Sequence, residues 1–240
     1  MQSDNLPTTC NFAIETTGLV GSVALGRSRH ILAAEIFTAT KRHALELLPT
    51  IDRLCRSKSL APTDIGELYV SAGPGSFTGI RIGITVARTV AWAADARVVC
   101  VPTLDVVAQN ALQLPDPPPN LAVFLDAKRN KVYAAAFKFF DGEFQRTTEP
   151  AEHDPAEFLR NLPRPAAVVG EGVPYVGEVL QQTDCTVLPD DLNRARAERV
   201  YALGYAAARQ GRFNDLGTLI PIYVRRPEAE EIWERRQSQG

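Results

Sequence analysis

The sequence predicts an α/β protein built from two similar lobes, and two observations carry this prediction. The first is that the order βββαβαβα occurs twice along the 240 residues. The second is the proline-rich stretch at residues 115–119, which predicts a stiff, extended connection between the two copies. We therefore predict a first lobe over residues 1–113 and a second lobe over residues 114–240, with a final helix that can pack back on the first lobe.

The first copy begins with three apolar segments separated by short turns, which predict an antiparallel meander. A helical pattern follows at residues 42–56, although Pro49 must kink this helix or shift its start. The meander is expected at residues 12–17, 21–26 and 31–37, and the copy closes with a strand at 68–71, a helix at 78–94, a strand at 97–101 and a helix at 103–113.

The second copy repeats this order. Asp154 followed by Pro155 predicts a helix N-cap and the first helical position after it. Gly211 is expected to end the last helix of the copy. The predicted strands are 121–126, 131–140, 143–148, 166–169 and 185–188. One predicted helix begins at residue 154, and two others cover 174–181 and 194–210.

Three meander strands and two crossover strands give a five-stranded mixed sheet in each lobe. Two such RNase H-like units that face each other across a cleft are the layout of the actin, sugar-kinase and Hsp70-ATPase (ASKHA) superfold. In that superfold the first hairpin of each lobe faces nucleotide phosphates. Glu15 and Thr16 in the first hairpin and Asp126 in the second are therefore candidate phosphate-facing residues. Capping of their own turns by the two acids is at least as good an interpretation.

A glycine-rich run joins the strand at 68–71 to the helix that follows. Its glycines permit backbone angles that other residues avoid. Gly83, Ala87 and Ala91 continue the four-residue spacing of Gly79, which predicts a helix face that another backbone can approach closely. The run matches neither a P-loop nor a dinucleotide fingerprint, so a functional loop and a tightly packed turn both remain open. The loop residues are Gly73, Pro74, Gly75, Ser76, Phe77, Thr78, Gly79 and Gly83.

Composition excludes several classes of function. The chain carries 26 Lys and Arg against 28 Asp and Glu, a formal net charge of −2, which provides no overall attraction toward nucleic acid or anionic membranes. Its four cysteines form no Cys-x-x-Cys pair, which is typical of buried thiols in a reducing compartment. The first nine residues are polar and lack the apolar segment of a signal peptide. We expect a cytoplasmic protein without membrane contact.

Metal chemistry is not predicted either. The three histidines, His30, His43 and His153, form no His-x-x-x-His pair, and no cysteine lies at ligand spacing from them. We therefore expect no bound metal, and we interpret His43 as a polar residue at the start of its helix. A metal-dependent glycoprotease of the M22 type is correspondingly disfavoured.

Six segments together resemble one family over nearly the whole chain, and the glycine-rich run is the most specific of them. They lie at residues 14–17, 42–49, 71–83, 126–135, 170–172 and 221–229. The chain resembles the TsaB (YeaZ) family, which takes part in making threonylcarbamoyladenosine next to the tRNA anticodon. Two positions depart from the commoner family pattern, since Glu15 replaces an aspartate and Lys128 replaces an arginine.

The resemblance implies a non-catalytic scaffold that binds the catalytic subunit TsaD through the helices at 42–56 and 78–94. The same surface would support a homodimer when TsaD is absent. The assembled pair would then bind the ATPase TsaE, would reach tRNA only as a complex, and could hold ATP or ADP at a subunit interface, while the isolated chain has no cofactor. The partner-binding residues implied by the matching helices are Arg42, His43, Leu47, Ile51, Phe77, Arg81, Thr85, Arg88 and Trp92.

Two other functions compete with this hypothesis, and one residue has a second interpretation. An independent ATPase or small-molecule kinase could use the cleft, but Glu15 and Asp126 are the only acids on the two hairpins available for magnesium. A direct tRNA-binding module would need a basic stripe with interleaved aromatic residues, and none is seen. The residues at 225–236 mix arginines and glutamates and predict a solvated or partner-facing helix. For Trp92, the alternative to partner binding is that it closes the core of the first lobe.

Overall fold

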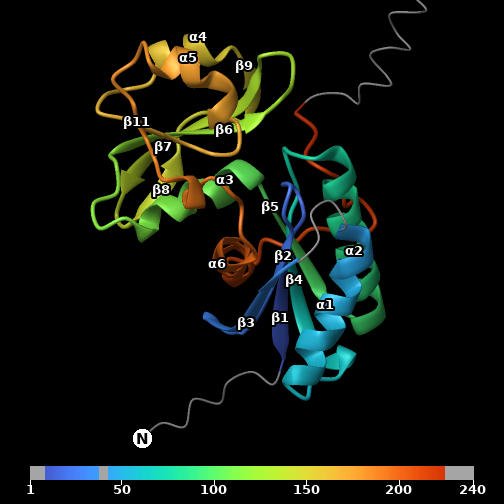
Figure 1. Ribbon diagram of the computed structural model, residues 1–240. Helices are drawn as coiled ribbons and strands as arrows, with labels where there is room; N and C mark the ends of the chain where they lie inside the picture. Colours follow the sequence, from blue (N-terminus) through green and yellow to red (C-terminus); the bar gives the residue numbers. More distant parts are fainter. Residues whose placement is uncertain (1–8, 38–42, 225–240) are drawn as a thin grey trace, which may run out of the picture.

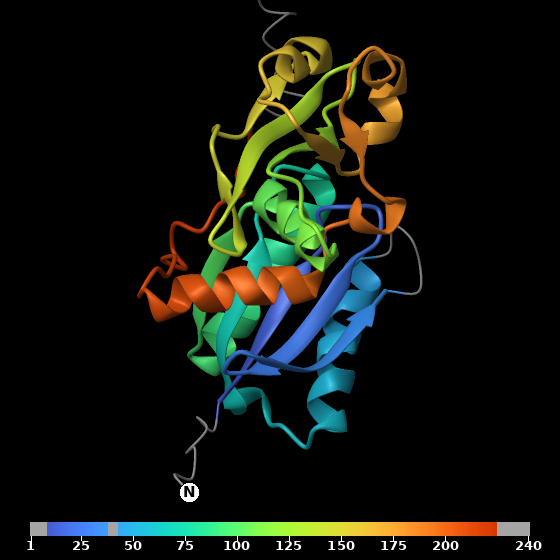
Figure 2. The ribbon, with the colours of Figure 1, turned by 90° about the vertical axis from the view of Figure 1, so that its left-hand side faces the viewer.

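The computed structural model describes residues 9–37 and 43–224 and shows two α/β lobes, one above the other in Figure 2. The first sheet has the order β3-β2-β1-β4-β5. Its first three strands form the predicted antiparallel meander, and β4 and β5 extend the sheet from β1 in parallel. The strands are β1 (Cys10–Glu15), β2 (Ser22–Arg27), β3 (His30–Ile36), β4 (Ile65–Ser71) and β5 (Arg97–Val101). The predicted helix at 225–236 lies outside the described residues.

Two helices, α1 (His43–Ser57) and α2 (Phe77–Ala94), lie side by side on one face of this sheet (Figure 1). Helix α1 runs through Pro49 without interruption, so the expected change in its start is wrong. A short 3-10 turn, η1 (Pro62–Asp64), connects α1 to β4.

The second sheet has six strands, with β11-β10-β6-β7-β8 in order and β9 paired to β7. Five strands were expected. The extra strand forms because β8 pairs only with the end of β7, from Phe137 onward, and leaves Val132–Ala134 free to pair with β9. The strands are β6 (Asn120–Asp126), β7 (Val132–Phe140), β8 (Glu143–Arg146), β9 (Ala151–His153), β10 (Ala167–Val169) and β11 (Thr186–Val187).

The helices of the second half are shorter than the sequence pattern predicts. Asp154 does cap α4 (Pro155–Arg160), because its Oδ1 accepts hydrogen bonds from the Ala156 and Glu157 amides at 3.0 and 3.2 Å. The helix expected at 174–181 instead divides into a 3-10 turn and a single α-helical turn. The two pieces of the divided helix are η3 (Val173–Val176) and α5 (Gly177–Leu180). They are followed along the chain by η4 (Asp190–Leu192) and α6 (Ala197–Arg209).

The last helix of each half packs on the sheet of the other half. Helix α3 (Thr103–Ala108), extended by η2 (Gln109–Gln113), buries Leu104 and Val107 against the second sheet. Helix α6 crosses the first sheet on the face opposite α1 and α2 (Figures 1 and 2), where Val200 and Tyr201 are buried. The two copies seen in the sequence are therefore joined by an exchange of helices.

This exchange explains the nearly continuous apolar strands at the centre of each sheet. In β1, Phe12 and Ile14 face α1 and α2 whereas Ala13 faces α6. In β6, Leu121 packs toward α3 whereas Phe124 packs toward α4 and α5. Because side chains alternate between the two faces of a strand, both sets must be apolar when both faces are covered.

Polar contacts fix α6 in place. Glu67 on β4, whose side chain is almost fully buried, accepts hydrogen bonds from Arg97 at 2.6 Å and from Arg209 at the end of α6 at 2.7 Å. At the other end of α6, the Ala197 amide donates to Ser22 Oγ at 3.0 Å. Ser22 thus satisfies a helix N-terminal amide from the opposite half of the chain. Within the described residues, no helix is long and apolar enough to cross a membrane.

Helix α6 lies very close to the first sheet at Gly204, where an added Cβ would lie 2.4 Å from Tyr69 Cγ. We predict that Gly204→Val destabilises the protein by about 1–3 kcal/mol, because it overpacks this crossing. The matched control is Ala206→Val on the exposed side of the same helix. Urea unfolding measures both. Equal stability of the two variants would contradict the packing described here.

Candidate functional site

The glycine-rich loop packs tightly against the turn at residues 16–21, between β1 and β2, which we call the first turn. A Cβ on Gly79 would lie 1.9 Å from the Thr16 carbonyl oxygen, and one on Gly83 would lie 2.5 Å from Thr16 Oγ1. Thr16 Oγ1 donates to the Gly79 carbonyl at 2.8 Å. Gly79, Gly83, Ala87 and Ala91 are all buried. The predicted close approach is therefore present, and its partner is the first turn.

The loop also begins α2. Ser76 is the N-cap, since its Oγ accepts from the Gly79 amide at 3.2 Å, while its own amide donates to the Thr17 carbonyl at 2.8 Å. Gly73 has a φ of +114° and lies against the Ile222 carbonyl, where an added Cβ would be 2.6 Å from that oxygen. Glycine is required at this position both for its backbone angle and for the lack of a side chain.

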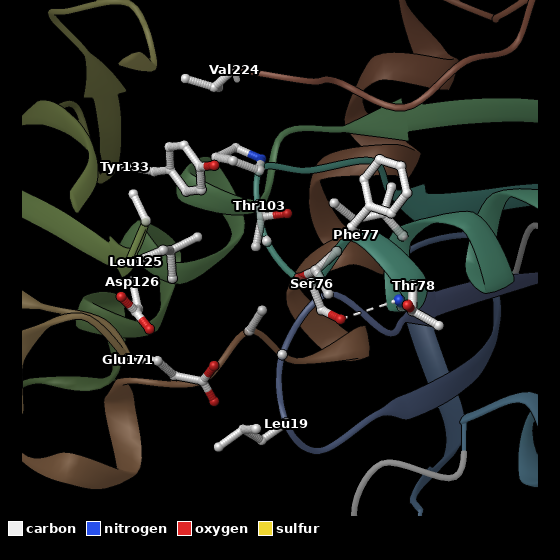
Figure 3. Close-up of a pocket in the computed structure, with 18 of the residues that line it drawn as sticks. Leu19, Ser76, Phe77, Thr78, Thr103, Leu125, Asp126, Tyr133, Glu171 and Val224 are labelled. Atoms are coloured by element: carbon white, nitrogen blue, oxygen red, sulfur yellow. Dashed lines mark hydrogen bonds between the residues drawn. The ribbon is translucent and has the colours of Figure 1, made fainter. Parts of the chain in front are cut away.

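A cleft of about 830 Å³ separates the lobes (Figure 3). The first lobe contributes the glycine-rich loop, with Pro74, Gly75, Ser76, Phe77, Thr78 and Gly79 among its lining residues. The second lobe contributes Asp126, Tyr133 and Glu171 (Figure 3), while Tyr223 and Val224 line it from the C-terminal segment. In the part of the chain that is described, no three His, Cys, Asp or Glu side chains are grouped so that they could hold a metal ion.

Glu15 and Thr16, two of the three candidate phosphate-facing residues, are fully buried and do not line the cleft. Glu15 Oε1 accepts from the Thr17 amide at 2.5 Å and from Thr17 Oγ1 at 2.6 Å. Burial raises the pKa of the Glu15 carboxyl, and these hydrogen bonds from Thr17 oppose the shift. Glu15 caps its own turn, which favours the second interpretation made from the sequence.

Asp126 does line the cleft, yet it also caps its own turn. Its Oδ1 accepts from the Lys128 amide at 2.8 Å, and the Lys128 ammonium group donates to Oδ2. The turn contains three successive residues with positive φ, at 67° for Lys128, 54° for Arg129 and 58° for Asn130. The Asp126 carboxylate satisfies the first amide of this left-handed turn.

The exposed face of α1 and α2 is the second candidate site. Trp92 is 82% exposed, so the alternative that it closes the core of the first lobe is wrong. Arg81, Thr85 and Arg88 are also exposed on α2. Thr85, Arg88 and Trp92 are available to a partner.

The residues predicted to bind a partner from α1 do not form part of this exposed face. Leu47 and Ile51 are buried in the core of the first lobe, so they attach α1 to the sheet and contribute no exposed surface. Buried His43 approaches the Gly18 carbonyl with Nε2 at 3.1 Å. Arg42 lies outside the described residues. The exposed apolar side chains of α1 are instead Leu45 and Leu48, at 69% and 50% exposure.

Leu45 and Leu48 were not recognised from the sequence as exposed residues, because the apolar side chains of α1 were not separated there into a buried and an exposed set. Their signal was a surplus of apolar positions: the buried residues follow the spacing 43, 47, 50, 51 and 54, and the two leucines fall outside that stripe. An apolar stripe that is wider than core packing requires indicates that the helix makes a second apolar contact.

Phe77 and Arg81 are tied to the C-terminal segment. Arg81 Nε donates to Tyr223 Oη at 3.0 Å, and its guanidinium lies 3.7 Å above the centre of the Phe77 ring. The Phe77 and Tyr223 rings are 5.3 Å apart, and the Ile222 amide donates to the Ala72 carbonyl at 2.7 Å. Residues 222–223 thus cover the start of α2, which the sequence did not indicate.

Comparisons with known proteins agree with this architecture. A model of the family described as "TsaD: tRNA N6-adenosine threonylcarbamoyltransferase" matches residues 35–233. A Bacillus subtilis protein described as "tRNA threonylcarbamoyladenosine biosynthesis protein TsaB" is 27% identical over 228 residues, which cover 92% of this chain and 96% of that protein. A Haemophilus influenzae protein of the same description is 36% identical over 124 residues, half of each chain. The solved structure of YeaZ from Pseudomonas aeruginosa matches with a TM-score of 0.77 and 25% identity, over 90% of this chain and 99% of that one.

The fold and its glycine-rich loop define a two-lobe protein of the actin, sugar-kinase and Hsp70-ATPase (ASKHA) superfold. More particularly, the chain belongs to the TsaB (YeaZ) family, whose members take part in threonylcarbamoyladenosine modification of tRNA.

Because Glu15 is buried, we expect the stability of the protein to depend on pH. Because its folded-state pKa is raised above the ordinary value of 4.5, the folded protein binds this proton more tightly than the unfolded chain does. Ionised Glu15 therefore lowers stability at neutral pH, and this cost disappears as pH falls toward 4.5. We predict that Glu15→Gln, which keeps an acceptor for Thr17, is more stable than the wild type at pH 7.5 by about 1 kcal/mol or more. Thermal melts should show the gain shrinking toward pH 5. A gain that is independent of pH would contradict the assignment.

Proposed function

We propose that this protein is a non-catalytic scaffold of the bacterial complex that transfers the threonylcarbamoyl group to adenosine beside the tRNA anticodon. It would bind the catalytic subunit TsaD, forming a heterodimer that TsaE then joins. The observation that carries the proposal is the exposed face of α1 and α2, defined here by Leu45, Leu48, Thr85, Arg88 and Trp92 and called the docking face. An exposed tryptophan beside an arginine is the composition that concentrates binding energy at protein interfaces.

The arrangement of the acids supports a positional rather than a chemical role. Glu15 is fully buried, with its Oε1 held by Thr17, and Asp126 holds its own turn and Lys128. Both hairpin carboxylates are thus engaged locally. Association with TsaD would order the catalytic subunit and create the platform for TsaE, and the same docking face would join two copies of this chain when TsaD is absent.

An independent ATPase or small-molecule kinase is the second candidate, and the cleft of about 830 Å³ beside the glycine-rich loop is the observation that favours it. Its magnesium would have to be held by Asp126 or Glu171, because Glu15 does not line the cleft. ATP or ADP at an interface of the assembled complex is compatible with the scaffold. Hydrolysis of ATP by the isolated protein, lost in Asp126→Ala, would favour the second candidate.

We predict that Trp92→Ala leaves the fold intact but weakens TsaD binding by about 2 kcal/mol, roughly thirtyfold in Kd. Arg88→Glu is expected to act in the same direction. The control is Phe140→Ala, which truncates an aromatic side chain of 60% exposure on the second lobe. Calorimetric titration with TsaD gives the affinities. Threonylcarbamoyl transfer to tRNA, measured with each subunit omitted in turn, should require this protein and should fall in parallel with binding. Wild-type affinity in a folded Trp92→Ala, Arg88→Glu double variant would refute the docking face.

A further inference from the structure

The two edges of the first sheet, β5 and β3, differ in how the chain covers them (Figure 1). At the β5 edge, the Cys100 amide donates to Asn214 Oδ1 at 2.8 Å, and Asn214 forms an antiparallel bridge with Val98. The segment after α6 thus covers this edge. At the other edge, β3 pairs with β2 alone. Within the described residues, no strand or bridge lies along the outer side of β3.

The outer side of β3 presents backbone groups that can form further hydrogen bonds. The Phe37 amide donates to the Gly21 carbonyl at 2.9 Å, so the backbone of residue 37 is directed toward the chain that enters β2. Because successive residues of an antiparallel strand direct their N–H and C=O groups to alternate sides, those of Ile36 point outward, as do those of Ala34. The register shift between β2 and β3 passes over Leu32, which has no partner on β2. An unpaired edge of this kind can accept another strand.

The side chains along this edge are apolar and exposed. Ile36 is 68% exposed and Leu32 is 40% exposed, and Ala34 between them is also exposed. Ala34 pairs with Ala24, which packs among the residues that contact α6, so Ala34 and Ile36 lie on the α6 side of the sheet. The strand contains no lysine or proline, the residues that commonly protect an edge from pairing with other chains. The edge is therefore suited to a strand with matching apolar positions.

The charge on β3 restricts how such a strand can lie. Glu35 accepts a hydrogen bond from Arg53 Nε of α1 at 3.0 Å, and Ala33 packs against the core of the first lobe, so both side chains lie on the α1 side of the sheet. Like charges directly opposite each other destabilise a sheet. If β3 pairs with its own copy, the register must therefore keep the two Glu35 side chains apart.

We propose that β3 pairs antiparallel with β3 of a second copy of this chain, with the two-fold axis at Ala34. In this register Leu32 lies opposite Ile36 of the second copy, and Glu35 lies opposite Ala33. The outward backbone groups of Ala34 and Ile36 are in phase for hydrogen bonding across the junction. Such a contact uses the same patch on both copies, as a two-fold interface requires.

Neighbouring registers fit less well. An axis at Glu35 would place the two carboxylates opposite each other, and an axis at Ala33 would place Ile36 opposite His30. The backbone phase, the apolar side chains and the charge thus favour the same register. No residue of the docking face belongs to β3, so this contact is distinct from the homodimer proposed above for that face.

The contact is small, which sets the strength to expect. One strand of seven residues provides much less area than the roughly 1,600 Å² buried in a standard interface. We therefore expect a dimer that dissociates on dilution.

The first test measures this dimer in a Trp92→Ala, Arg88→Glu background, which disables the proposed docking face. Sedimentation analysis over a series of concentrations should still show a monomer–dimer equilibrium. Adding Ile36→Lys should weaken the dimer at least about tenfold, because an apolar contact is lost and a charge is placed at the junction. The matched control is Ile220→Lys, which replaces another exposed isoleucine, and it should stay within about threefold of the background.

The second test measures the register. In a hydrogen-bonded antiparallel pair the two Cα atoms are about 5.5 Å apart, within the range of a disulfide. Under mild oxidation, Ala34→Cys should therefore form a covalent dimer. The control is Arg29→Cys, at an exposed position before β3 and away from the axis, which should remain monomeric on a non-reducing gel. The wild-type chain, with its four native cysteines, provides the background level of cross-linking.

Three results would overturn the inference. One is a background variant that stays monomeric at every concentration, which would leave the β3 edge to a strand of a different protein. Another is a dimer that Ile36→Lys and Ile220→Lys affect equally. The third is an Ala34→Cys chain that cross-links no more than Arg29→Cys, and this measurement decides the question if Ile36→Lys fails to fold.

Discussion

The structure depends on the exchange of helices between the two halves of the chain. Helix α6 covers the face of the first sheet that α1 and α2 leave open, and α3 does the same for the second sheet. In the described part of the chain, neither sheet has both faces covered by helices of its own half. The buried Glu67, held by Arg97 and Arg209, fixes the far end of α6 and so the relation between the lobes. The cleft, the first turn and the docking face are all arranged around this crossing.

Much of the fold could be predicted because its signals are local. The repeated order of strands and helices follows from apolar spacing and turn residues, and Asp154 with Pro155 marks the start of α4 correctly. A final helix that packs back on the first lobe was considered from the sequence, and α6 lies there. The matching position of α3 on the second sheet could not be deduced, because an apolar helix face shows that a helix packs and does not show on which sheet. Strand β9 was missed for a similar reason: it forms only where the long β7 extends beyond β8.

In the candidate site, too, single residues could be predicted only where their signal is local in the sequence. The sequence placed the glycine ridge of α2 correctly, since four-residue spacing is a property of one helix. On α1, however, periodicity grouped Leu47 and Ile51 with the apolar face without showing that this face is the core. The exposure of Leu45 and Leu48 and the contact of Tyr223 with Arg81 and Phe77 depend on long-range packing, which only the folded chain brings about. Glu15 illustrates the reverse case, in which a residue at a position associated with phosphates in the superfold caps its own turn.

We propose that this protein acts through the outer face of α1 and α2 and leaves its cleft free of the partner. Hydrogen exchange of the protein alone and with a saturating amount of TsaD tests this most directly. New protection is expected on α1 and α2, together with slower exchange in the first turn, whose Thr17 and Gly18 carbonyls contact Ser76 and His43 at the starts of the two helices. Protection confined to the residues lining the cleft, with α1 and α2 unchanged, would contradict it.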